Sequence, residues 1–132
     1  MATVVTNVGV AIVPDRIRGT GTEPVYIGWG TGAGTAAVGD TTLFTERAVD
    51  LSATTGTRTT GTSSSQTTDV SGDTWRLTGT RTATGSGTVT NAGCFTDVDI
   101  AEGTLFVKGD FTGIGLATND SIAFTINVDF DN

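Results

Sequence analysis

Ile122-Ala-Phe-Thr-Ile-Asn-Val-Asp-Phe130 is the stretch that decides the fold, because a large apolar residue occupies every second position. Successive side chains of a β-strand point to opposite faces, so this spacing places all the large apolar side chains on one face. The smaller and polar residues between them face the other way. The segment is therefore predicted to be a strand with one buried face and one face in solvent.

Other strands are predicted where apolar residues alternate or cluster between turn signals. Residues 4–13 are mostly apolar and are predicted to form a core strand that ends at Pro14. Thr and Gly together supply more than a third of the chain, and both disfavour helices, so helix content should be minimal. The remaining predicted strands are residues 25–29, 75–83, 88–95, 97–100 and 104–108.

The expected fold class is all-β, with residues 1–132 in a single domain. Val, Ile, Leu and Phe are frequent enough to build a modest core. About eight short strands fit an antiparallel β-sandwich better than an open sheet, because each apolar face needs a second layer. We expect the jelly-roll form of that sandwich. The predicted core contains Val8, Val10, Ile27, Trp29, Phe106, Ile122, Phe124 and Ile126.

Several kinds of chemistry are excluded by the residue counts. The chain contains no histidine, so it cannot assemble a Ser-His-Asp or Cys-His nucleophile system or a His-based metal site by itself. Cys94 is the single cysteine, and it is predicted to be a small buried hydrophobe. We therefore expect no catalytic site and no obligate cofactor.

Charge and hydropathy narrow the possible partners. A net charge of −7 opposes binding to nucleic acid backbones and to anionic membranes. The first residues lack the basic and apolar segments of a signal peptide, and no run approaches the roughly 18 apolar residues of a membrane span. The sequence thus predicts a protein that is made and used without secretion, with neither nucleic acid nor membrane as a partner.

The glycine-rich stretch Gly28-Trp-Gly-Thr-Gly-Ala-Gly34 follows a predicted strand, as phosphate-binding loops do. No lysine follows it, and Ala33 stands where a dinucleotide-binding loop needs its third glycine. Residues 30–42 are instead predicted to be a long exposed connection.

Asp97, Asp99 and Glu102 are weak candidates for a metal site. In a strand, Asp97 and Asp99 would face the same side and could offer oxygens to calcium. The complete calcium-loop pattern is absent, so the alternative is a set of solvated acids. Carboxylate pairs such as Asp97 with Asp99 or Asp129 with Asp131 would suit glycoside hydrolysis in principle. In so acidic a chain they are explained by surface charge alone.

Several motifs resemble those of small structural proteins from the virions of tailed bacteriophages, a group that includes tail-fibre and capsid decoration proteins. The likeness covers roughly residues 4–130 and keeps the same order of motifs. The motifs are Tyr26-Ile-Gly-Trp-Gly-Thr-Gly-Ala-Gly-Thr-Ala-Ala37, Asp40-Thr-Thr-Leu-Phe-Thr-Glu-Arg47, Val89-Thr-Asn-Ala-Gly-Cys-Phe95, Gly103-Thr-Leu-Phe-Val-Lys-Gly-Asp-Phe111 and Asn119-Asp-Ser-Ile-Ala-Phe-Thr-Ile126.

This resemblance implies an all-β virion protein without enzymatic activity. We expect a capsid decoration (cement) protein that lies on the outer head surface and bridges subunits of the major capsid protein. It would be synthesised in the host cytoplasm and form a homo-oligomer, a dimer or a trimer, on the virion. The alternative is a tail-fibre or receptor-binding component of the phage tail.

Three segments are expected to contact the partner: residues 1–13, 31–40 and 54–69. The third contains no aliphatic or aromatic side chain, so it is predicted to be either a solvated edge strand or a mobile loop. An edge strand can offer its backbone groups to a partner.

Overall fold

The computed structural model describes residues 1–131. Strands hold 44% of the residues and helices 8%, so most of the regular secondary structure is β. The all-β prediction and the expected low helix content are therefore confirmed. The elements within this range are β1 (Thr3–Val5), α1 (Asn7–Val10), α2 (Ile12–Ile17), β2 (Tyr26–Gly30), β3 (Glu46–Arg47), β4 (Thr59–Thr60), β5 (Thr62–Gln66), β6 (Thr74–Thr82), β7 (Gly87–Phe95), β8 (Leu105–Leu116) and β9 (Ser121–Asp129).

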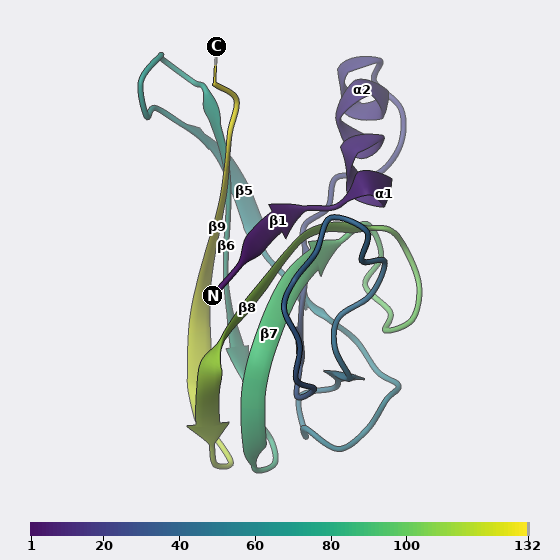
Figure 1. Cartoon of the computed structure of the whole chain (residues 1–132), viewed down its shortest axis with the longest axis vertical. Helices are drawn as coiled ribbons and strands as arrows, with labels where there is room; N and C mark the ends of the chain where they lie inside the picture. The colour runs from purple at the N-terminus through teal and green to yellow at the C-terminus, as the bar shows by residue number, and fades with distance from the viewer. Residues whose placement is uncertain (132) are drawn as a thin grey trace.

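The strands form two antiparallel sheets that pack as a sandwich (Figure 1). The larger sheet has the order β1-β8-β7-β2-β3, and β4 also pairs with β2. The smaller sheet has the order β5-β6-β9. This strand order does not establish the jelly-roll connections that we expected.

Most of the strands predicted from alternation are confirmed to within a residue or two at each end. They correspond to β2, β6, β7 and β9. The segment predicted at residues 104–108 is the first part of the longer β8, while residues 97–100 form bends and a turn with one isolated bridge rather than a strand. Residues 30–42 form a mostly exposed connection after β2, as expected.

The core lies between the two sheets and has two main clusters. Trp29 is central to one and Ile27 to the other, and Phe124 of β9 packs against both. Ile27, Trp29 and Phe106 are buried as predicted, and Cys94 is buried beside Ile27. Ile122, Phe124 and Ile126 face the core but remain partly exposed, because β9 lies at the edge of its sheet.

The prediction of one core strand over residues 4–13 is wrong. The chain leaves β1 at Val5, and the Thr6 hydroxyl then accepts a hydrogen bond from the Gly9 backbone N–H at 3.0 Å, which caps α1. Val8 and Val10 lie on α1 and are 41% and 55% exposed, so their assignment to the core is also wrong. The helix turns them toward solvent, whereas an extended chain would have pointed them inward.

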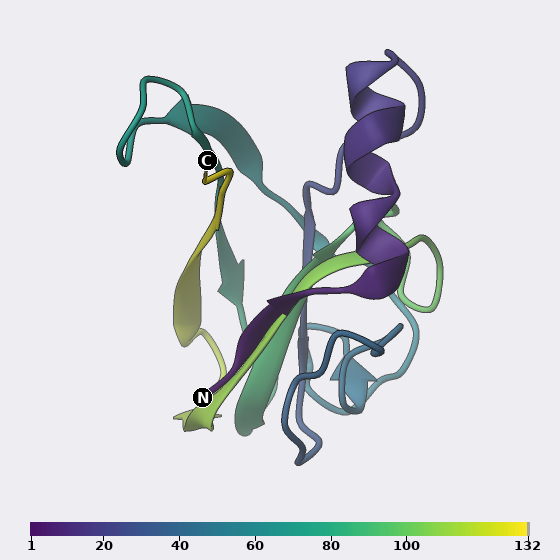
Figure 2. The ribbon, with the colours of Figure 1, turned by 45° about the horizontal axis from the view of Figure 1, so that its top comes forward.

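Gly9 allows α1 to lie directly on β8. A Cβ atom at this position would be 2.7 Å from the backbone oxygen of Leu105 and from the Cα of Phe106. Figure 2 shows α1 and α2 running one after the other as a single helical arm beside the sandwich.

Candidate interaction surface

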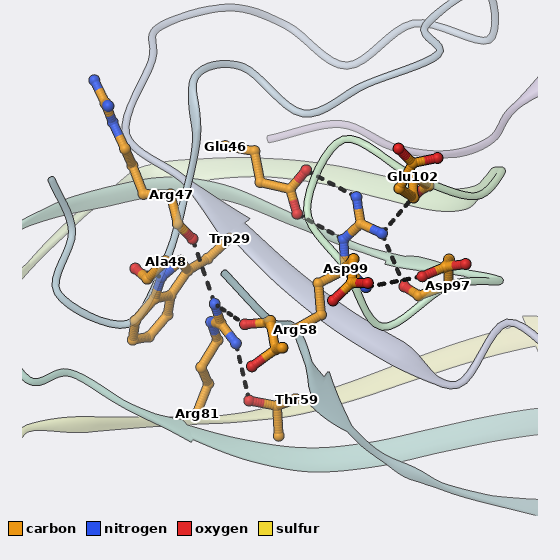
Figure 3. A network of polar contacts seen from close by, with 11 residues as sticks. Trp29, Glu46, Arg47, Ala48, Arg58, Thr59, Arg81, Asp97, Asp99 and Glu102 are labelled. Carbon is orange, nitrogen blue, oxygen red and sulfur yellow. Dashed lines mark hydrogen bonds and ion pairs between the residues drawn. The ribbon is translucent and has the colours of Figure 1, made fainter. Parts of the chain in front are cut away.

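The three acids predicted as weak metal candidates lie in the loop between β7 and β8, not in a strand. The Asp97 carboxylate accepts a hydrogen bond from the Asp99 backbone N–H at 2.9 Å, so it closes a turn. Across the described residues, no three His, Cys, Asp or Glu side chains come together in a way that could hold a metal ion. The loop's contacts instead run to Arg58, as Figure 3 shows.

Arg58 is the centre of a buried polar network that the sequence did not indicate. Its guanidinium binds both carboxylate oxygens of Glu46, at 2.7 and 3.0 Å, and donates to the backbone oxygens of Asp97 and Glu102. It also stacks on the Phe95 ring, 3.4 Å from the ring centroid. Because Glu46 belongs to β3 and the two backbone oxygens belong to the β7–β8 loop, the guanidinium joins that strand to that loop (Figure 3).

Arg81 links the two sheets through a second buried guanidinium. It projects from β6 beneath the Trp29 ring and donates to the Thr59 hydroxyl and to the backbone oxygens of Arg47 and Thr57. Burial lowers the pKa of Arg81 to about 10, although Glu46 nearby opposes that shift. The group therefore stays charged at neutral pH, and its contacts are structural.

Lys108 holds the connection after β2 against the larger sheet. Its Nζ lies 2.8 Å from the carboxylate of Asp40 and 2.8 Å from the backbone oxygen of Thr42, and it sits over the Phe44 ring. The hydrogen bond from Lys108 is the main reason why the pKa of Asp40 is lowered from its ordinary value. This buried ion pair gives an otherwise irregular segment a fixed position.

The same connection is joined to the N-terminal segment. The Asp110 carboxylate accepts hydrogen bonds from the backbone N–H groups of Ala2 and Ala36, and the Asn7 N–H donates to the Val38 oxygen at 2.7 Å. Residues 1–13 and 31–40, two of the segments predicted to contact a partner, therefore lie side by side. The exposed large apolar side chains of these two segments are Met1, Val8, Val10 and Val38, and we call this set the N-terminal patch.

An apolar groove lies beside α2, and we call it the α2 groove. It encloses about 360 Å³ between α2 and the end of the smaller sheet. Trp75 packs edge-on against Phe106, with 5.5 Å between ring centroids, and its indole N–H donates to the Glu23 carboxylate. Ile17 is 82% exposed and Phe130 is 50% exposed. The lining residues are Ile12, Val13, Arg16, Ile17, Glu23, Pro24, Trp75, Phe106 and Phe130.

The third predicted contact segment, residues 54–69, is divided between the two sheets. It contributes β4 to the larger sheet and β5 to the edge of the smaller one, so the prediction of a solvated edge strand is confirmed for β5. Arg58, within this segment, is nevertheless buried. Ser63, Ser64 and Ser65 of β5 line a second hollow that shares Glu23, Trp75 and Phe130 with the α2 groove.

Sequence reasoning missed the helical arm and therefore the groove beside it. The available signals were Thr6, which is a favoured capping residue, and Pro14, which is tolerated in the first turn of a helix. Within residues 1–131, no helix is long and apolar enough to cross a lipid bilayer. No protein-family model, curated protein or solved structure matches the chain.

Proposed function

We propose that the chain is a bacteriophage virion protein that decorates the outside of the head and binds the major capsid protein without catalysing a reaction. The sequence motifs that resemble virion proteins support this setting. The observation that carries the proposal is the presence of two exposed apolar sites along the helical arm, the N-terminal patch and the α2 groove. Exposed apolar residues that gather around a hollow, as they do at the α2 groove, commonly mark a protein-binding site.

The geometry suits attachment to a preassembled shell. The N-terminal patch is held in place by backbone hydrogen bonds and by the Asp110 carboxylate, so little order has to be gained when a partner binds. The α2 groove offers a hollow with an aromatic floor, which suits an apolar side chain that projects from a partner. Together they offer two separate apolar sites along one arm, as a protein that bridges neighbouring subunits requires.

The charge balance agrees with a position outside the shell. Acidic residues outnumber basic ones by two to one, and the only lysine is buried in an ion pair. Such a surface is repelled by packaged nucleic acid. The proposed partner is therefore protein.

Co-sedimentation with particles that lack this protein tests the proposal. Wild-type protein should sediment with such heads, and Val10→Asp or Ile17→Asp should weaken binding at least about tenfold, because each places a charge in an apolar contact. Ile114→Asp, at an exposed apolar position on β8 outside both sites, is the control and should bind like wild type. The proposal would be refuted if the wild type failed to sediment with heads, or if the Val10 and Ile17 variants bound heads as tightly as the wild type.

A receptor-binding part of the phage tail is the second candidate. The aromatic floor of the α2 groove, with the Glu23 carboxylate beside Trp75, also suits the apolar face and hydroxyl groups of a sugar ring. In that case the purified protein would adsorb to host cells and sediment with tails, not with heads.

A further inference from the structure

β9 forms a long and unpaired outer edge of the smaller sheet. Its ladder with β6 runs without a bulge from Ser121 opposite Thr82 to Asp129 opposite Thr74. In the part of the chain that the structure describes, the other side of β9 pairs with no strand and takes part in no backbone hydrogen bond. Figure 1 shows the strand at the margin of the molecule.

The direction of the free backbone groups follows from the two ends of the ladder. The Asp120 oxygen accepts from the Ala83 N–H, and the Phe130 N–H donates to the Asp73 oxygen, so even-numbered residues of this segment point their backbone groups at β6. Odd-numbered residues therefore point theirs outward. These residues are Ser121, Ala123, Thr125, Asn127 and Asp129, and their side chains are exposed as well.

This edge has few of the features with which natural proteins protect open strands, because its single charged residue is Asp129 at the end of the strand. Residues 121–129 contain no Lys, Arg, Pro or Gly, and the register with β6 shows no bulge. The other edges are shorter: β5 has five residues and β1 has three. A nine-residue edge of regular register, with every outward donor and acceptor unpaired, is suited to strand addition.

We propose that β9 pairs antiparallel with β9 of a second copy of this chain, about a two-fold axis at Thr125, so that the two smaller sheets become one continuous sheet. In this register Thr125 lies opposite Thr125 of the partner subunit and exchanges both backbone hydrogen bonds with it. Ala123 then pairs with Asn127 of the partner subunit, and Ser121 with Asp129 of the partner subunit. All of the outward-pointing backbone groups become satisfied.

The sequence of β9 is complementary to itself in this register. On the inner face, Phe124 lies opposite Ile126 of the partner subunit, and Ile122 lies opposite Val128 of the partner subunit, so apolar side chains meet apolar ones. On the outer face, threonine meets threonine, and no two like charges are directly opposite. This self-complementarity favours a second copy over an unrelated strand, and it does not depend on the function proposed above.

Proline substitution tests the edge without disturbing the fold. Because the Thr125 N–H points away from β6, Thr125→Pro removes a donor only from the proposed dimer. Ser65→Pro is the matched control, because β5 is the opposite edge of the sheet. The Gly61 N–H points away from β6 toward Val25, and the N–H of Ser65, an even number of residues later, points the same way. Sedimentation equilibrium should give a dimer for wild type and Ser65→Pro, and a monomer for Thr125→Pro. A monomeric wild type, or equal dissociation of both variants, would overturn the proposal.

Cysteine crosslinking tests the register and does not need the proline variant to fold. Burial raises the pKa of the Cys94 thiol to about 12, so the native cysteine does not compete. A Thr125→Cys pair at the axis would have Cα atoms about 5.5 Å apart, within disulfide range. Ala123→Cys would be about 14 Å from its own copy. Mild oxidation should link Thr125→Cys into dimers and leave Ala123→Cys unlinked; equal linking of both would rule the register out.

Discussion

Nζ of Lys108, the only lysine in the chain, lies 2.8 Å from Oδ2 of Asp40. The lysine side chain is almost fully buried, whereas the aspartate side chain is about a quarter exposed. The pair fixes the irregular connection after β2 against β8, and that connection supplies Val38 to the N-terminal patch. This ion pair therefore both stabilises the fold and positions part of the surface that we propose binds the capsid.

The two halves of this pair should not be equally sensitive to mutation. Asp40→Asn leaves the charge of Lys108 buried without a counter-charge, and it should cost about 3 kcal/mol of unfolding free energy. Lys108→Met removes the buried charge and leaves an aspartate that water can reach, so it should cost less. Urea unfolding of both variants checks the order. A larger loss of unfolding free energy for Lys108→Met would contradict this order, and would show that the hydrogen bonds of Lys108 stabilise the fold by more than its buried charge destabilises it.

Acid should destabilise the protein through its hydrogen-bonded aspartates. The hydrogen bond from Lys108 lowers the pKa of Asp40, and the N–H of Ala36 lowers the pKa of Asp110. A carboxyl with a lower pKa in the folded state gives stability above its unfolded pKa of about 3.9, and that stability is lost as the pH falls through the folded pKa.

Urea midpoints should therefore be flat from about pH 7 to 5 and fall below about pH 4. Asp110→Asn should make the fall shallower, because one of the titrating groups is gone. A midpoint that rises as the pH drops from about 5 to 3 would mean that relief of the net negative charge outweighs these bonds.

Gly9→Ala tests the docking of the helical arm. The added Cβ would be 2.7 Å from backbone atoms of Leu105 and Phe106, which cannot move aside as a flexible side chain can. We expect a loss of about 2 kcal/mol and displacement of α1, seen as shifts of the Val8 and Val10 signals in NMR spectra. Gly39→Ala, with nothing within 4 Å, is the control and should be neutral. If Gly9→Ala left the unfolding free energy unchanged, α1 would not be held against β8.

Phe124→Ala tests the shared core of the sandwich. Because Phe124 packs against both clusters, its truncation should cost about 3 kcal/mol, at the low end of the range for buried phenylalanines since β9 is an edge strand. Thr80→Ala on the exposed face of the neighbouring β6 should change stability by less than about 0.5 kcal/mol. Calorimetric or urea unfolding measures both, and a loss below about 1 kcal/mol at Phe124 would remove it from the core.

The strands were predictable where a period of two runs unbroken, as from Ile122 to Val128. The N-terminal segment was not, because Val8, Val10 and Ile12 also share the parity of a strand while Thr6 and Pro14 direct a helix. In such a segment, the local capping residues are better guides than the apolar pattern.

The buried charges could not be predicted for a different reason. Arg58 lies in a threonine-rich stretch that composition alone places in solvent, and its partners Glu46, Asp97 and Glu102 come from other parts of the chain. Only the pairing of strands brings these residues together. The same is true of the α2 groove, since Trp75 comes from β6, Phe130 directly follows β9, and Ile17 comes from the helical arm.

The number of copies in each virion tests the central claim most directly. A protein that decorates an icosahedral head occurs in proportion to the major capsid protein, because it follows the symmetry of the shell. Quantitative mass spectrometry of purified particles should therefore count this chain in the hundreds, in a fixed small ratio to the major capsid protein. A count of a few copies, matching the three-fold or six-fold symmetry of a tail, would place the protein in the tail and contradict the account.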